Sequence, residues 1–216
     1  MLTIDYYSDI LCVWAWIAEH RIEELRREFP SELQLNHHYI DVFGDVPGKI
    51  ARQWQDRGGY AGYASHVAES CANFPEIPLH QDVWHQVRPA SSANPHLALK
   101  ATALTHNQAT ADALASSLRR AFFTEGANIG QRTVLDAKMQ HANIDTNAVT
   151  AAIEDGSALA ALMQDYQRAR ELGLKGSPSF MMNEGRQVLY GNVGYRVLSA
   201  NIAELLTNHE QGASWC

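Results

Sequence analysis

The stretch from Leu2 to Ala18, LTIDYYSDILCVWAWIA, decides the expected fold of this 216-residue chain. Its first part, Leu2 to Tyr7, mixes β-branched and aromatic residues in the way that a short strand does. From Trp14 onward, apolar residues recur at helical spacing until shortly before Pro30, which ends the helix. Leu33 to Ile40 then alternates well enough to form a second strand. Strand, helix and strand over this length predict a βαβ unit with a right-handed crossover.

The far end of the chain predicts the rest of a small sheet. Ser179 to Met182 and Gln187 to Tyr190 are predicted as short strands that are joined by a hairpin loop. A last helix is predicted from about Tyr195 to Leu206. The middle of the chain has helical patterns at Ala93–Thr105, Ala109–Thr124, Thr133–His141, Thr146–Glu154 and Ala158–Glu171, and an interrupted one over 46–74. We therefore expect an α/β domain of residues 1–42 and 171–216, with a helical insertion at 43–170 and the active site between them.

Charge and cysteine content narrow the expected partners and compartment. The chain has 17 Lys and Arg against 24 Asp and Glu, for a formal net charge of −7. Nucleic acids and anionic membranes bind concentrated basic surfaces, so neither is expected as a partner. The apolar run Ile10–Ala18 is too short to cross a bilayer and follows acidic residues, unlike a signal peptide. Three cysteines (Cys12, Cys71 and Cys216) do not form a disulfide framework, so we expect a protein of the reducing cytoplasm.

Cys12 is the candidate catalytic residue, because it stands where the first strand gives way to the first helix. Taken alone, a cysteine in an apolar run is typical of a small buried hydrophobic residue. The turn after such a strand, however, lies at the carboxyl edge of the sheet, where α/β folds place their chemistry. The free N–H groups and the dipole of a helix N-terminus favour a thiolate. Lowering the thiol pKa by two units needs about 2.7 kcal/mol, and a helix terminus supplies about 0.3–1 kcal/mol. Direct hydrogen bonds to the sulfur would have to supply the remaining stabilisation of the thiolate.

The segment Cys12-Val13-Trp14-Ala15 resembles the amino end of DsbA-like thioredoxin-fold proteins, where the motif is Cys-x-x-Cys. It is at least as similar to the kappa-class glutathione transferases and 2-hydroxychromene-2-carboxylate isomerases. Those carry Ser-Pro-Tyr-Ser and then an aromatic residue, as Trp16 follows here. A second matching region is 173–180, in which Pro178 resembles the superfamily's cis-proline. The resemblance implies a thioredoxin fold with a large all-helical insertion. It also implies that the backbone of Ser177 docks an extended thiol peptide such as glutathione.

Departures from the family pattern limit what the resemblance implies. Ala15 replaces the second cysteine with which a dithiol oxidant resolves its mixed disulfide. The stretch 192–194 lacks the carboxylate that helps to hold the γ-glutamyl end of glutathione in the glutathione-binding relatives. Cys12 keeps a thiol where those relatives have serine. Asp9 stands where the family keeps an acidic residue, although its simplest role is to end the first strand.

Three functions stay open at this point. The first is a thiol-dependent oxidoreductase, in which Cys12 forms a mixed disulfide with a small thiol or disulfide substrate. External thiol or Cys216, as a resolving thiol, would then release the product. The second is a glutathione-dependent transferase or isomerase, and the third is a redox-silent binding module. No tightly bound cofactor is expected, glutathione is the candidate co-substrate, and homodimerisation is an expectation that rests on the relatives alone.

Three further residues are candidates for substrate contact. Trp14 is expected to wall a substrate groove, and Asn192 stands beside the last predicted strand. His96 could face the Cys12 pocket as a general acid or substrate contact, but the pattern favours a surface position on its helix. Cys71 is expected to be structural. The chain has ten histidines, but none has the spacing to cysteine or carboxylate of a known zinc site, so no metal is expected.

Overall fold

A four-stranded mixed sheet forms the centre of the fold in the computed structural model, which describes residues 1–207. The strands are β1 (Leu2–Ser8), β2 (Leu33–Tyr39), β3 (Ser179–Met182) and β4 (Gln187–Tyr190), in the order β2-β1-β3-β4. β1 pairs in parallel with β2, and β3 pairs antiparallel with both β1 and β4. A short 3-10 helix, η2 (Asn183–Gly185), makes the β3–β4 connection. The predicted βαβ unit and hairpin are confirmed.

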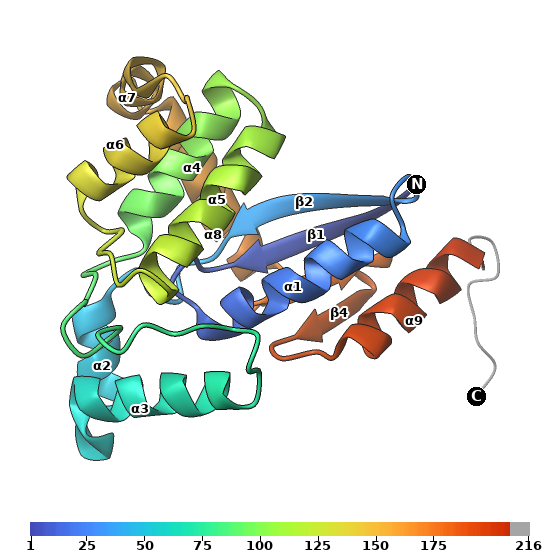
Figure 1. Ribbon diagram of the computed structural model, residues 1–216. Helices are drawn as coiled ribbons and strands as arrows, with labels where there is room; N and C mark the ends of the chain where they lie inside the picture. Colours follow the sequence, from blue (N-terminus) through green and yellow to red (C-terminus); the bar gives the residue numbers. More distant parts are fainter. Residues whose placement is uncertain (208–216) are drawn as a thin grey trace.

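Two helices cover one face of this sheet, as Figure 1 shows: α1 (Val13–Glu28) and α9 (Tyr195–Thr207). Alternate residues of β1 point to that face because successive side chains of a strand take opposite sides. The core there contains Leu2, Ile4 and Tyr6 from β1, Ala18, Ile22 and Leu25 from α1, and Leu198 and Ile202 from α9. Tyr7 takes the other side of β1, where it packs with Ile40 and Ala169. β1 is therefore buried on both faces at its carboxyl end, as its apolar sequence suggests.

The middle of the chain is helical. Its elements are α2 (Val46–Gln53), η1 (Gln55–Arg57), α3 (Gly59–Ala72), α4 (Ala93–Thr105), α5 (Gln108–Phe123), α6 (Arg132–His141), α7 (Thr146–Glu154) and α8 (Ser157–Glu171). Figure 1 shows α4 to α7 gathered at one end of the sheet, with α2 and α3 side by side below them. The predicted interruption of the 46–74 helix is confirmed, because Gly58, between η1 and α3, and Gly59, the first residue of α3, both have positive φ.

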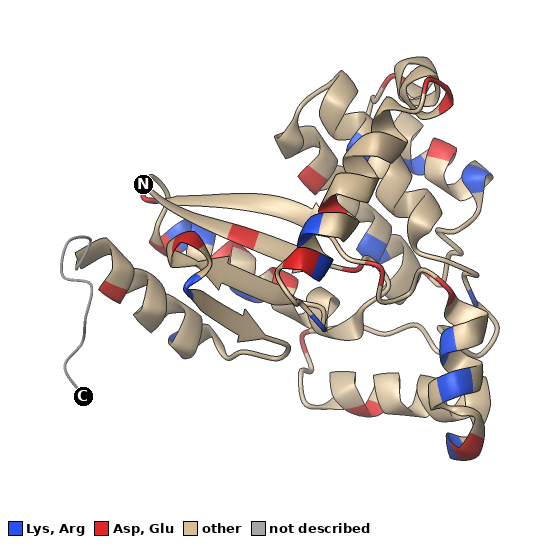
Figure 2. Ribbon diagram, turned by 180° about the vertical axis from the view of Figure 1, so that it is seen from behind, with Lys and Arg blue, Asp and Glu red and all other residues tan. Residues whose placement is uncertain are grey.

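The helical elements and the β1–α1 turn share one apolar cluster. Ile10, Leu11 and Cys12 belong to it together with Leu99 of α4 and Phe123 of α5. Trp16 stacks on the Phe123 ring with centroids 5.8 Å apart, so α5 packs directly against the start of α1. Lysine, arginine and acidic positions are interspersed along the ribbon seen from behind, without one continuous face of a single sign (Figure 2).

Candidate functional site

Cys12 is the N-cap of α1, at the carboxyl end of β1. Its backbone is extended, and its N–H donates to the Asp9 carbonyl at 3.1 Å, which closes the turn after the strand. Its carbonyl accepts from the Trp16 N–H at 3.0 Å and so begins the helix. Only 5% of the residue is exposed. The chain thus presents a nearly buried sulfur at the amino end of a sixteen-residue helix.

A cis peptide bond between Ser177 and Pro178 faces this turn. The Sγ–H of Cys12 donates to the Ser177 carbonyl at 3.1 Å, across 165 residues of sequence. The Ser177 hydroxyl accepts from the Asp9 N–H at 2.8 Å, which joins the same two segments a second time. Pro178 in turn accepts from the Gly191 N–H at 2.8 Å. The cis-proline that the resemblance implied is therefore present, with its loop against the candidate sulfur.

Burial raises the pKa of the Cys12 thiol above its ordinary value. The side chain of Ser177 and the backbone N–H groups of Ala15 and Trp14 act in the opposite direction, and the nearby Asp9 carboxylate adds to the rise. The lowered pKa that a preformed thiolate would need is not reached, because desolvation penalises the thiolate more than the groups at the helix N-terminus stabilise it. The bond from Sγ to the Ser177 carbonyl also requires the protonated thiol.

Asp9 is a fully buried carboxylate below the turn. It accepts from the Leu11 N–H at 2.9 Å, from the Phe43 N–H at 2.8 Å and from the Ser92 hydroxyl at 2.8 Å. Burial raises its pKa to about 6, although these three bonds hold it lower than burial alone would. One carboxylate therefore ties the β1–α1 turn to the segment after β2 and to the start of α4. The simpler prediction for Asp9 was that it ends the first strand. That role does not explain any of these three hydrogen bonds.

His96 is fully buried, so its predicted surface position is wrong. Its Nε2 accepts from the Ile10 N–H at 3.0 Å, which puts the ring proton on Nδ1, and Nδ1 donates to the Tyr166 hydroxyl at 3.0 Å. Burial lowers the pKa of His96 to about 3, so the ring is neutral. The ring also stacks on Tyr39, with centroids 4.6 Å apart. With both nitrogens engaged, His96 holds the backbone of the turn and does not offer a group to a substrate.

Of the four other residues singled out in the sequence, the structure describes three. Trp14 is half-buried and packs against the apolar cluster that contains Cys12. Asn192 is exposed and directly follows Gly191, the residue that binds the Pro178 carbonyl. Cys71 is buried on α3, where burial raises its pKa to about 11. Cys216 lies outside the described residues.

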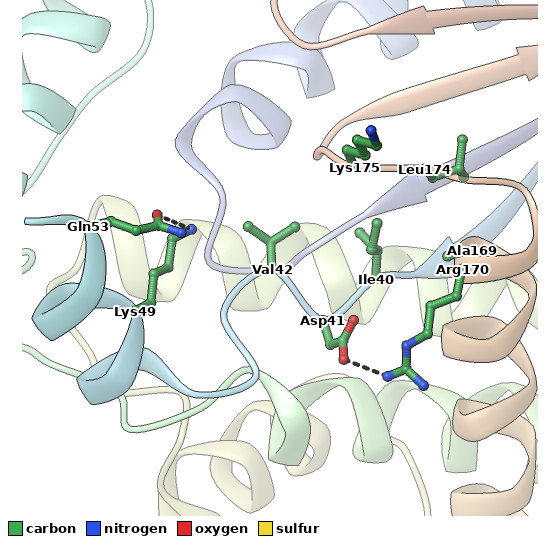
Figure 3. Close-up of a pocket in the computed structure, with 9 residues that line it drawn as sticks. All are labelled: Ile40, Asp41, Val42, Lys49, Gln53, Ala169, Arg170, Leu174 and Lys175. Atoms are coloured by element: carbon green, nitrogen blue, oxygen red, sulfur yellow. Dashed lines mark hydrogen bonds and ion pairs between the residues drawn. The ribbon is translucent and has the colours of Figure 1, made fainter.

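A pocket of about 260 Å³ lies beside the cis-proline loop. Lys49 and Gln53 enter it from α2, and Lys175 lies across from them, two residues before Ser177 (Figure 3). Asp41 and Arg170 form an ion pair of 2.9 Å at its edge. Within residues 1–207, no group of three or more His, Cys, Asp or Glu side chains is arranged to hold a metal ion. The helices of that same range are also too short or too polar to cross a membrane.

Comparisons with protein families and with curated proteins each find a match. A family profile described as the DSBA-like thioredoxin domain matches residues 3–203. The ClpXP adapter protein SpxH of Halalkalibacterium halodurans is 28% identical over 185 residues, which are 83% of this chain and 58% of that protein. The chain thus spans less than two thirds of the length of this curated relative.

Solved structures agree with the profile on the fold. A candidate protein disulfide isomerase from Nitrosomonas europaea has a TM-score of 0.78 at 16% identity, over 96% of this chain and 98% of that one. The cytosolic disulfide reductase DsbM of Pseudomonas aeruginosa has a TM-score of 0.70 at 21% identity, over 94% and 100% of the two chains. A 2-hydroxychromene-2-carboxylate isomerase has a TM-score of 0.69 at 16% identity, over 98% and 100%. Because these sequence identities are low, the similarity shows that the chain has the thioredoxin fold and is not evidence of a shared activity.

Proposed function

The chain belongs to the DSBA-like thioredoxin domain family, and on that premise we propose that it is a single-cysteine thiol–disulfide oxidoreductase. The solved relatives include a cytosolic disulfide reductase and a 2-hydroxychromene-2-carboxylate isomerase, and the proposal makes this chain an enzyme of the same broad kind. The observation that carries the finer proposal is the distance of 3.1 Å from the Cys12 Sγ to the Ser177 carbonyl, beside a cis-proline. An extended substrate docked on this loop brings its own sulfur to Cys12.

The proposed reaction is thiol–disulfide exchange at Cys12. The Cys12 thiol gives up its proton to solvent and its sulfur attacks one sulfur of a small disulfide. The bond between the two substrate sulfurs breaks, and the leaving thiolate takes up a proton. Cys12 is then held in a mixed disulfide with the other half of the substrate. A second small thiol attacks this mixed disulfide, forms a disulfide with the bound half and returns the electron pair to the Cys12 sulfur, which regains its proton.

The second thiol has to come from outside the helix turn. Ala15 occupies the position of a resolving cysteine, and Cys71 is buried on α3. Free small thiols are therefore the first source that we propose, and Cys216 is the second. A pool of such thiols exists in the reducing cytoplasm, which supports that compartment for the protein. One solved relative is itself named as a cytosolic disulfide reductase, and a second structure of it contains GSH.

The test is to identify the cysteine that reacts with a disulfide. We expect glutathione disulfide to leave one glutathionyl group on Cys12, found by peptide mass mapping, and the Cys12→Ser variant to lose all disulfide-exchange turnover. Cys216→Ser is the matched control: it keeps the Cys12 adduct, and slower turnover in that variant assigns resolution to Cys216.

Two other outcomes would replace the proposal. If Cys12→Ser retains turnover and reduced glutathione raises the melting temperature, the protein is a glutathione-dependent isomerase or transferase. If Cys12 takes no adduct and neither form of glutathione stabilises the fold, the protein is a binding module without redox chemistry.

A further inference from the structure

The pocket beside the cis-proline loop contains an excess of positive charge. It is lined by the segment after β2, by α2 and by the residues before Ser177. Among its charged groups, Arg170 is paired with Asp41 at 2.9 Å. Lys49 and Lys175 are the two cations that remain, and they enter from opposite sides of the pocket (Figure 3).

Neither of these lysines has an acidic partner within residues 1–207. The Nζ of Lys49 donates to the Gln53 side-chain oxygen at 3.1 Å and lies 5.0 Å from the centre of the Phe43 ring. Lys175 is exposed and makes no hydrogen bond or ion pair in the described part of the chain. The other two lysines of the sequence, Lys100 and Lys138, are each paired with a carboxylate, at 2.8 Å and 2.6 Å. In a protein of net charge −7, both lysines that lack a carboxylate partner within residues 1–207 therefore line the same pocket.

This pocket also lies within electrostatic reach of the candidate sulfur. Burial lowers the pKa of Lys49, and the charges of Asp9 and Cys12 act against that shift, so the ammonium group senses both. On the other side, Lys175 is separated from Ser177 by Gly176 alone. The Ser177 carbonyl is the atom that binds the Cys12 sulfur. The pocket lining thus ends two residues before the carbonyl that binds the sulfur, and we infer from the proposed function that a small molecule reacting at Cys12 extends into the pocket.

We propose that Lys49 and Lys175 bind a carboxylate of the substrate, and that the enzyme acts on small disulfides and thiols that carry negative charge. This inference rests on the proposed function at Cys12. Two ammonium groups without acidic partners attract an anion from solution and orient it once it is bound. At about 260 Å³ the pocket accepts a short carboxylate-bearing arm of a substrate and not a folded protein surface.

The experiment compares three disulfides of similar size in the Cys216→Ser background. They are dithiodiglycolate, which has two carboxylates, hydroxyethyl disulfide, which is neutral, and cystamine, which has two amines. We expect Cys12 to react with dithiodiglycolate about tenfold faster than with hydroxyethyl disulfide, and slowest with cystamine. The preference should fall as ionic strength rises, because these charges are partly exposed to solvent.

Variants show whether the pocket causes the preference. Lys49→Gln combined with Lys175→Gln should bring the three rate constants to within about twofold of one another. The ratios are the measure, because loss of the Lys49 charge, which interacts with Cys12, also changes the rate that all three disulfides share. Arg27→Gln combined with Arg196→Gln is the matched control. It removes the same charge from exposed positions on α1 and α9 and should keep the preference. A retained melting temperature shows that each variant is folded.

Two results overturn this inference in distinguishable ways. If Cys12 reacts with all three disulfides at similar rates, or if the lysine variants keep the preference, the carboxylate site is refuted and the proposed function stands. If Cys12 forms no adduct with any of the three disulfides, the proposed function fails and this inference fails with it.

Discussion

At the scale of the residue, the sulfur of Cys12 is the feature on which the chemistry depends. It lies at a helix N-terminus, where amide N–H groups and the dipole favour a thiolate, but it is also 95% removed from solvent. Burial dominates, so the resting enzyme holds a thiol that donates to the Ser177 carbonyl. Under the proposed function, a substrate that docks on the cis-proline loop competes for that carbonyl and frees the sulfur from its hydrogen bond.

The raised pKa predicts how the reactivity of Cys12 changes with pH. Because the thiol stays protonated through neutral pH, its carbamidomethylation by iodoacetamide should accelerate about tenfold per pH unit until above pH 8.5. Rates measured by peptide mapping separate Cys12 from Cys71, whose pKa of about 11 makes it the slower internal reference. A Cys12 rate that levels off below pH 7 would contradict the raised pKa and indicate a preformed thiolate.

At the scale of elements, one buried arginine joins three of them. Arg119 of α5 is 2% exposed, and its guanidinium donates to Glu19 of α1 at 2.9 Å and to the Ser8 hydroxyl at the end of β1 at 2.8 Å. These contacts hold α5 against the beginning of the candidate site. Nothing in the local sequence identifies Arg119, because a cation on a helix is usually exposed.

Removal of this cation should destabilise the protein strongly. Arg119→Met leaves the largely buried Glu19 with the Ser116 hydroxyl as a donor but without its cation, and we expect it to lower the free energy of unfolding by about 3–5 kcal/mol. The double variant Arg119→Met and Glu19→Gln should recover part of that loss, because no uncompensated charge remains. Urea denaturation of the four proteins in the cycle measures the coupling. Additive effects of the two substitutions would contradict the ion pair.

At the scale of the whole molecule, the sheet and the helices are joined by one core. The division into residues 1–42 plus 171–216 and residues 43–170 stays our proposal for the domains. The cluster that contains Cys12 crosses that division through Leu99 and Phe123, so we expect both parts to unfold together. Two histidines have a pKa that burial lowers to about 3: His37 on β2, which is half-buried with Asp112 at 3.5 Å, and His96 on α4, which is fully buried.

These histidines predict a loss of stability in acid. Below pH 6.5 the unfolded chain takes up protons that the folded chain does not, so stability falls as pH decreases. The loss reaches about 2.7 kcal/mol per histidine at pH 4.5. Asp9 acts in the opposite sense, because its pKa of about 6 is raised: stability is gained as pH falls from 6 toward 4. With two histidines against one carboxylate, the free energy of unfolding should be lower at pH 4.5 than at pH 7.

A single substitution tests the histidine contribution. His37→Gln should reduce the difference in unfolding free energy between pH 7 and pH 4.5 by about 2.7 kcal/mol, measured by urea denaturation. His141→Gln, at an exposed position of α6, is the control and should leave the difference unchanged. An equal effect of the two substitutions would show that His37 titrates normally in the folded protein.

The helices, the strands and the position of the candidate sulfur could be predicted from the order of the residues alone. The predicted bounds of α4, α7, β3 and β4 agree with the structure, because hydrophobic periodicity and the flanking breakers are local properties. The motif around Cys12 and the later Ser177-Pro178 pair were likewise visible, because each is a short run of residues. The resemblance that they carry led to the correct fold.

The protonation states and the charge environment of the site became visible only in the folded structure. His96 lies on a helix with buried residues on nearly all sides, so its periodicity does not indicate which side chains are exposed. The protonation of Cys12, the three donors on Asp9 and the meeting of Lys49 with Lys175 all depend on segments far apart in the chain. Desolvation and charge coupling sum over every neighbour in space, and no local pattern of residues specifies those neighbours.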